Sequence, residues 1–220
     1  MKFSVGSCSR FEVPWAAELP RIALWLILPA SFLLLAVSPE LALLALLALI
    51  GVAGGYGNLE GKLSRRVAPL RSYWHLCWLL PLVVVGNGVL TILWVLAFKK
   101  IGFPIDSEQD VARLLYDSDG VARFRLLFLV LVVAPVFEEL FYRRLLFNLL
   151  LPLGGLVAFV VTALIFSLSH GFAAGIPALF LLGSMFQYTY LKNGDILYPI
   201  IFHILFNLNS TLMIIFLGMV

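Results

Sequence analysis

The stretch that decides the fold is PVFEELFYRR, residues 135–144. It lies in an apolar run from about residue 126 to residue 150, where a charge near a bilayer centre costs roughly 2.5–3.5 kcal/mol on insertion scales. On a helix, Glu139 and Arg143 are four residues apart and share one face, so they can form an ion pair. Glu138 points about 100° away from that face. The pattern therefore predicts one glutamate that Arg143 holds and a second that is free to react.

The composition indicates a multi-pass membrane protein. Hydrophobic residues make up 62% of the 220 residues and charged residues only 12%, whereas soluble domains carry about 45–50% and about 25%. The net charge of +3 would suggest nucleic acid binding in a soluble chain. Here the basic residues flank apolar segments, so membrane topology explains them and no nucleic acid partner is expected.

Seven apolar segments predict an all-α bundle of about seven transmembrane spans. They cover residues 22–37, 41–56, 74–98, 124–150, 154–170, 174–191 and 196–219. An eighth, re-entrant segment is the alternative. We expect one integral-membrane domain over residues 1–220, with the catalytic motifs within 126–220. The connections after Leu150 are short, which favours mostly antiparallel packing of the last four helices.

Two further segments carry polar residues. Residues 107–117 resemble a capped short helix with an apolar side, and we expect it to lie on the membrane surface. A gate over the site is the weaker alternative. Asn87, between Gly86 and Gly88, brings a carboxamide into an apolar segment. An interhelical hydrogen bond is the ordinary explanation for such a residue.

Two of the three histidines fall in the last spans. His170 closes the segment 166–170, and His203 lies four residues before Asn207, so the imidazole and the carboxamide share a helix face. A carboxylate can take a proton from water, and a histidine can share that proton. A second imidazole with an amide can donate to a developing oxyanion. These residues and the two glutamates form a candidate catalytic constellation.

The three motifs resemble those of a known family. Glu138-Glu139-x-x-x-Arg143, Phe166-x-x-x-His170 and His203-x-x-x-Asn207 are similar to the motifs of the CAAX-protease and bacteriocin-processing intramembrane endopeptidases. The resemblance covers about residues 126–220, with motif order and spacing intact. The first half of the chain matches that family only as generic spans.

The resemblance implies an intramembrane endopeptidase and a role for each motif. Glu138 would be the base that activates water, assisted by His170. Glu139 and Arg143 would position the first helix. The third motif, His203-x-x-x-Asn207, would stabilise the oxyanion. The substrate would be a membrane-associated protein or peptide that is cleaved near a terminus.

Metal dependence is left open by the residues. Glu138, His170 and His203 could make a three-ligand zinc site, but no H-E-x-x-H spacing appears. We favour a metal-free glutamic mechanism with no cofactor. One geometric difficulty is that Glu138 lies near mid-span, whereas His170 ends its segment. Bringing these residues together requires a tilt, a longer helix or a break.

Two other functions deserve comparison. Buried carboxylates also suit a proton-coupled transporter, but the two halves show no inverted repeat and no paired broken helices. A catalytically inactive relative is a third alternative, although every motif position is filled. Candidate substrates are prenylated CAAX tails, bacteriocin leaders and C-terminal sorting tails. The compact chain favours a bacterial plasma membrane.

Overall fold

The computed structural model describes residues 73–103 and 110–217. The chain divides into two compact units, Met1–Gly61 and Lys62–Val220, and every described residue belongs to the second. The spans expected at 22–37 and 41–56 lie outside the described residues. A single domain over the whole chain therefore stays a prediction.

The described residues are helical and contain no strand, which confirms the all-α fold class for this part of the chain. The α-helices are α3 (Trp74–Lys100), α4 (Asp110–Asp117), α5 (Gly120–Phe128), α6 (Ala134–Glu139), α7 (Phe147–Leu150), α8 (Gly155–Ser169), α9 (Ile176–Asn193) and α10 (Leu197–Leu217). Two π-helical segments, η3 (Leu129–Val133) and η4 (Leu140–Leu146), and two 3-10 segments, η5 (Leu151–Leu153) and η6 (Ala173–Gly175), connect them.

Three helices within the described residues are long and apolar enough to cross a membrane. They are Trp74–Lys100, the continuous helix Gly120–Leu153, and Leu197–Leu217. Helix α8 is also apolar but has only 15 residues, a length of roughly 22 Å against a hydrocarbon core of about 30 Å. The protein is thus an integral membrane protein, while the count of seven spans stays a prediction.

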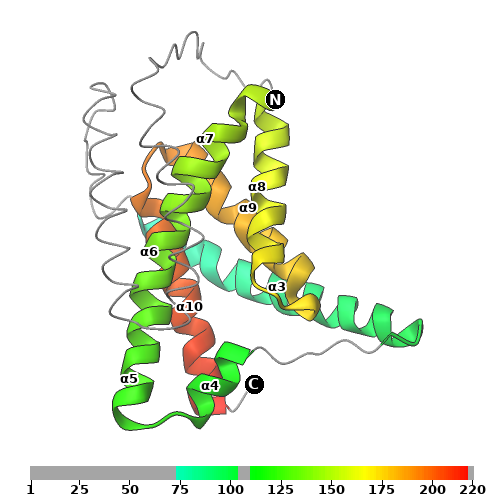
Figure 1. Ribbon diagram of the computed structural model, residues 1–220, viewed down its shortest axis with the longest axis vertical. Coiled ribbons are helices and arrows are strands. Elements are labelled where there is room, and N and C mark those ends of the chain that lie inside the picture. Colours follow the sequence, from blue (N-terminus) through cyan, green and yellow to red (C-terminus); the bar gives the residue numbers. More distant parts are fainter. Residues whose placement is uncertain (1–72, 104–109, 218–220) are drawn as a thin grey trace. The chain divides into compact units, whose positions relative to one another are not determined.

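The helix Gly120–Leu153 runs without a break through α5, η3, α6, η4 and α7 (Figure 1). Pro135 explains why it widens into a π-turn at η3. Proline has no N–H and its ring clashes with the carbonyl four residues earlier, so a regular α-helix cannot pass through this position unchanged. In η3 the N–H of Ala134 instead bonds the carbonyl of Leu129, five residues back. The two π-segments bracket α6, which ends with both glutamates.

Helices α8 and α9 form the closest helix pair in the described unit (Figure 1). Gly183 of α9 makes this approach possible. A methyl group added at Gly183 would lie 2.9 Å from Cδ1 of Phe166, which is fully buried on α8. Small residues at helix interfaces allow such close packing in membranes, where apolar attraction between helices is weak.

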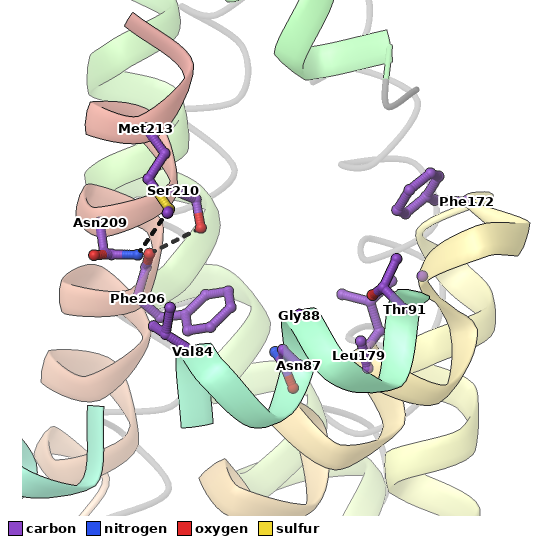
Figure 2. A pocket seen from close by; sticks show the side chains of 12 residues that line it. Val84, Asn87, Gly88, Thr91, Phe172, Leu179, Phe206, Asn209, Ser210 and Met213 are labelled. Atoms are coloured by element: carbon purple, nitrogen blue, oxygen red, sulfur yellow. Dashed lines mark hydrogen bonds between the residues drawn. The ribbon is translucent and has the colours of Figure 1, made fainter. Parts of the chain in front are cut away.

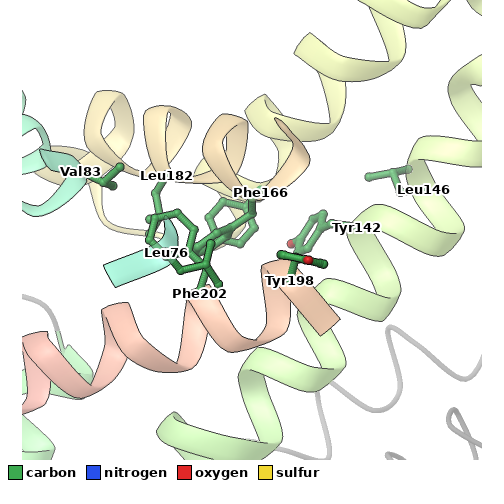
Figure 3. Packing of buried hydrophobic residues seen from close by; sticks show 9 residues of the cluster. Leu76, Val83, Tyr142, Leu146, Phe166, Leu182, Tyr198 and Phe202 are labelled. Atoms are coloured by element: carbon green, nitrogen blue, oxygen red, sulfur yellow. The ribbon is translucent and has the colours of Figure 1, made fainter. Parts of the chain in front are cut away.

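The core joins side chains from five segments (Figure 3). Its members are buried and mainly aromatic or leucine: Leu76 and Val83 of α3, Tyr142 and Leu146 of η4, Phe166 of α8, Leu182 and Phe186 of α9, and Tyr198 and Phe202 of α10. Phe166 packs edge-on against the Tyr142 and Phe186 rings, at centroid distances of 5.1 and 6.0 Å. These are the preferred aromatic geometries. The core thus fixes η4, α8 and α9 around the residues of the first two motifs.

The short helix expected at 107–117 is confirmed over Asp110–Asp117 as α4. It is amphipathic: Ala112 and Leu115 are buried, while Leu114 and Tyr116 are exposed. Its buried side packs against α10. The location of this helix on the membrane surface stays a prediction.

Candidate active site

Glu138 and His170 face each other across the first two motifs. Oε2 of Glu138 lies 3.8 Å from Nε2 of His170, and the two side chains are 14% and 20% exposed. This separation is too long for a direct hydrogen bond. Oε2 of Glu138 has no hydrogen-bond partner among the residues that the structure describes. The two side chains are therefore close and partly exposed, but they do not form a direct hydrogen bond with each other.

The backbone of its own helix orients His170. Nδ1 of the ring lies 2.7 Å from the carbonyl oxygen of Phe166, and because a carbonyl only accepts, Nδ1 carries the hydrogen. In a neutral ring Nε2 is then an acceptor, aimed toward Glu138. His170 follows the last residue of α8, and Gly171 turns the chain with φ of +63°. The short helix and this turn answer the geometric difficulty: His170 lies at a helix end, which approaches Glu138 of α6.

A second hydrogen-bond chain reaches the same carbonyl. Oγ of Ser169 donates to the Phe166 carbonyl oxygen at 2.9 Å. The hydroxyl of Tyr142 lies 2.6 Å from Oγ of Ser169, and because the single serine hydrogen is already used, Tyr142 is the donor. Tyr142 is almost fully buried. Sequence reasoning missed this support for the His170 turn, although Tyr142 is four residues after Glu138.

Glu139 and Arg143 form the ion pair that their spacing predicts. Nε of Arg143 lies 2.9 Å from Oε2 of Glu139, and the two side chains are 1% and 0% exposed. Nη2 of Arg143 donates to the Gly183 carbonyl oxygen at 3.0 Å. The guanidinium also lies 5.0 Å from the Phe166 ring and 5.4 Å from the Phe186 ring, within cation–π range. Arg143 thereby joins the helix Gly120–Leu153 to α9.

His203 belongs to this buried pair rather than to the partly exposed one. Its Nδ1 lies 2.8 Å from Oε1 of Glu139, and the ring stacks on Phe186 at 4.5 Å. Glu139 is thus ion-paired with Arg143 through one oxygen and accepts a hydrogen bond from His203 on the other. No pattern in the sequence predicts the Glu139–His203 contact, because the two residues are 64 positions apart.

Asn207 binds the π-helical segment. Its Nδ2 donates to the carbonyl oxygen of Val130 at 2.9 Å. In η3, Leu129 takes the N–H of Ala134, and the residue five positions after Val130 is Pro135, which has no N–H to donate. Asn207 therefore satisfies a carbonyl that the widened turn leaves open. One of its two amide hydrogens is still available.

The three proposed zinc ligands are not gathered into one metal site. Among the described residues, no group of three or more His, Cys, Asp or Glu side chains is arranged to hold a metal ion. Nδ1 of His203 is engaged by Glu139, and Nδ1 of His170 by a backbone carbonyl. Glu138 and His170 provide two neighbouring donors, so the arrangement does not fit the three-ligand set.

The fold and the site define an integral membrane protein that places an acid–histidine pair inside its helices. Residues 121–209 match the family model for "Type II CAAX prenyl endopeptidase Rce1-like", so this part of the chain is similar to that family. No curated protein and no solved structure matches the chain. The match agrees with the resemblance carried by the three motifs. It supports an intramembrane CAAX-type endopeptidase and does not favour a transporter.

Proposed function

We propose that this protein is an intramembrane endopeptidase in which Glu138 activates water for the hydrolysis of a peptide bond. The observation that carries the proposal is the Glu138–His170 pair, 3.8 Å apart and partly exposed, within the residues that match the Rce1-like family model. The neighbouring Glu139 is completely buried and bound on both oxygens. Of the two adjacent glutamates, Glu138 is the partly exposed one and is therefore the one that a reactant can reach.

The position of the hydrogen on the His170 ring supports the role of Glu138 as a base. With Nδ1–H of His170 bound to the Phe166 carbonyl, Nε2 and the Glu138 carboxylate are both acceptors. Two acceptors at 3.8 Å are stabilised only by a shared proton or by a water molecule that donates to both. A water at about 2.8 Å from each atom fits this separation. A water molecule in this position would lie where Glu138 can take its proton.

The reaction balances with these two residues alone. Water gives one proton to Glu138 while its oxygen attacks the substrate carbonyl carbon, forming a tetrahedral intermediate. Glu138 then returns the proton to the amide nitrogen, the C–N bond breaks, and a carboxylic acid and an amine leave. His170 shares the proton while it is held on Glu138, which is ordinary general acid–base catalysis.

Stabilisation of the oxyanion is assigned to the third motif, and Asn207 is the stronger donor. Its Nδ2 keeps one hydrogen beyond the bond to Val130. His203 donates through Nδ1 to Glu139, so its Nε2 can donate to an oxyanion only when the ring is protonated. We therefore propose Asn207 as the oxyanion donor and His203 as its assistant in the protonated form.

The proposed mechanism uses no cofactor, and a chelator tests this directly. Purified protein is assayed before and after treatment with a strong zinc chelator. Unchanged cleavage is the expected result. Loss of cleavage that added zinc restores would keep Glu138, His170 and His203 in the site and change their role to metal ligands.

The family match supports a membrane-associated protein as the substrate. We propose a membrane-associated protein whose terminus is cut, with prenylated CAAX tails as the first candidates and bacteriocin leaders or sorting tails as the others. We also propose the bacterial plasma membrane as the location. The test is a cleavage assay on these tails in proteoliposomes, with the product termini read by mass spectrometry. Transport of an ion or solute without any cleavage would overturn the proposal.

A further inference from the structure

Tyr142 and Ser169 link the two helices that carry the candidate catalytic pair, Glu138 and His170. The Tyr142 hydroxyl lies 2.6 Å from Oγ of Ser169. Tyr142 comes four positions after Glu138, and residues four apart lie on one face of a helix. Ser169 is the last residue of α8 and immediately precedes His170. The hydrogen bond therefore connects the same two segments as the 3.8 Å gap between the pair, and it lies beside that gap.

One backbone carbonyl group binds both Ser169 and His170. Oγ of Ser169 and Nδ1 of His170 lie 2.9 and 2.7 Å from the Phe166 carbonyl oxygen. Helix ends fray, and the chain turns away from α8 at Gly171 with φ of +63°. A hydrogen bond from outside the helix therefore matters more at this end than it would in the middle of α8. Tyr142 supplies such a bond.

Tyr142 is well placed to hold this end because it is itself fixed. Its side chain is 1% exposed, and its ring packs edge-on against Phe166 at a centroid distance of 5.1 Å. A hydroxyl buried without a partner is costly, so the bond to Ser169 is strongly favoured. The ring and the hydroxyl together fix the direction from which Tyr142 reaches the end of α8.

Packing leaves space on the other side of the turn that follows His170. Phe172 in this turn lines a groove of about 230 Å³ between α3, α9 and α10 (Figure 2). The ring N–H of Trp94 on α3 donates to the Ala173 carbonyl oxygen at 3.1 Å. The turn is thus held by hydrogen bonds on both sides, with Tyr142 on the side of the candidate catalytic pair.

We propose that the hydrogen bond from Tyr142 to Ser169 sets the separation of the candidate catalytic pair. The two residues are then positioning residues for the hydrolysis, and they act through His170. This inference rests on the proposed function and adds two residues to its site. A gap that admits one water between two acceptors is narrow, because a hydrogen bond weakens beyond about 3.2 Å. Small displacements of reacting groups therefore reduce the rate strongly.

The first test removes each hydroxyl and separates kcat from KM. The full-length protein in proteoliposomes is assayed with a fluorescent peptide that ends in a farnesylated CAAX sequence. Tyr142→Phe keeps the buried ring, and we expect kcat to fall about tenfold with KM unchanged, the effect of one lost hydrogen bond. Ser169→Ala should slow the reaction by the same factor. Ser169→Thr keeps a hydroxyl and should retain most of the rate.

Matched controls remove a hydroxyl elsewhere in the chain. Tyr188→Phe changes an exposed tyrosine of α9. Ser118→Ala removes a serine hydroxyl that also bonds a backbone carbonyl, that of Leu114. Both controls should keep kcat. A Tyr142→Phe effect confined to KM, an equal loss in the controls, or equal rates for Ser169→Ala and Ser169→Thr would overturn the proposal.

A double variant separates positioning from stability. Ser169→Ala leaves the buried Tyr142 hydroxyl without its partner and should lower the melting temperature, whereas removing both partners of a hydrogen bond can be nearly neutral. Tyr142→Phe combined with Ser169→Ala should therefore melt closer to the unmodified protein than Ser169→Ala alone. Its kcat should stay as low as in the single variants. A kcat that recovers together with the melting temperature would assign the bond a purely structural role and reject the proposal.

Hydrogen exchange tests the link without any cleavage. The N–H of Gly171 bonds the Leu168 carbonyl oxygen at 3.2 Å, and its exchange with deuterium reports local opening at the end of α8. Exchange in peptides that cover residues 166–172 should be faster in Tyr142→Phe than in Tyr188→Phe. Faster exchange supports the link even if the unmodified protein does not cleave the probe, a result that counts against the proposed function alone. Equal exchange in the two variants rejects the link even if cleavage occurs.

Discussion

Nδ1 of His203 lies 2.8 Å from Oε1 of Glu139, and the second oxygen of the same carboxylate lies 2.9 Å from Nε of Arg143. Glu139 therefore joins α10 to the helix Gly120–Leu153. Its neighbour Glu138 faces His170 instead. Two adjacent carboxylates thus have separate environments: Glu139 is fully buried between Arg143 and His203, and Glu138 is partly exposed beside His170.

Arg143→Ala should destabilise the protein strongly. Removing one partner of a buried ion pair leaves the other charge uncompensated, at a cost of about 3–5 kcal/mol. Glu139→Gln should act in the same direction, because it leaves the Arg143 charge buried without its counter-ion. The measurement is thermal unfolding in detergent. Arg144→Ala is the control, because Arg144 is only partly buried and adjacent in sequence. Equal melting temperatures for the Arg143 and Arg144 variants would contradict a structural role for the pair.

Glu138→Gln should abolish cleavage without lowering the melting temperature. A glutamine cannot take a proton from water, while removing a partly buried charge that forms no ion pair with a described Lys or Arg relieves a desolvation cost. His170→Ala should likewise lose activity and remain folded. Turnover and melting are measured on the same preparations. Near-normal turnover of Glu138→Gln on a verified substrate would show that Glu138 is not the base.

The separation of the two glutamates was predictable because it is local. A spacing of four residues places Arg143 on the face of Glu139, and the one-residue offset turns Glu138 away from it. The partner of Glu138 also follows from the motifs. What the sequence could not give is the approach of His203 to Glu139, because a contact across 64 residues depends on how the helices cross.

The sequence predicts only one side of the Asn207 contact, the backbone carbonyl that lacks a donor. Pro135 has no N–H, so it predicts that a carbonyl in the preceding turn lacks its usual hydrogen-bond donor. It does not say which residue will donate instead, and the donor is 77 positions away. The predicted count of seven spans is not tested, because two of the expected spans lie outside residues 73–103 and 110–217.

Asn207→Ala should lower stability as well as activity. It removes the donor that binds the Val130 carbonyl, and an unpaired buried acceptor costs about 1–3 kcal/mol. Pro135→Ala restores a backbone N–H near that carbonyl, so the stability cost of Asn207→Ala should shrink in the Pro135→Ala background. The double-mutant cycle is measured by thermal unfolding. Strict additivity would show that Pro135 is not the reason for the Asn207 contact.

Gly183→Ala should loosen the α8–α9 pair and weaken the hold on Arg143. The added methyl group would lie 2.9 Å from the Phe166 ring, and overpacking typically costs about 1–3 kcal/mol. Gly155→Ala is the control, because nothing lies within 4 Å of its added methyl group. Melting temperatures report the effect. If Gly183→Ala is as stable as Gly155→Ala, the close approach of the helices is not required.

The continuous helix Gly120–Leu153 also constrains how the chain enters the membrane. Its second half carries four charges, at positions 138, 139, 143 and 144, and of these only Glu139 and Arg143 pair with each other. The other partners of these charges come later in the chain. The Gly183 carbonyl of α9 contacts Arg143, His203 of α10 contacts Glu139, and His170 at the end of α8 lies near Glu138. During synthesis this segment leaves the ribosome before any of those partners exists. Stable insertion of this segment therefore waits for the last third of the protein, and a chain that stops before α10 would leave Glu139 without its histidine inside the lipid.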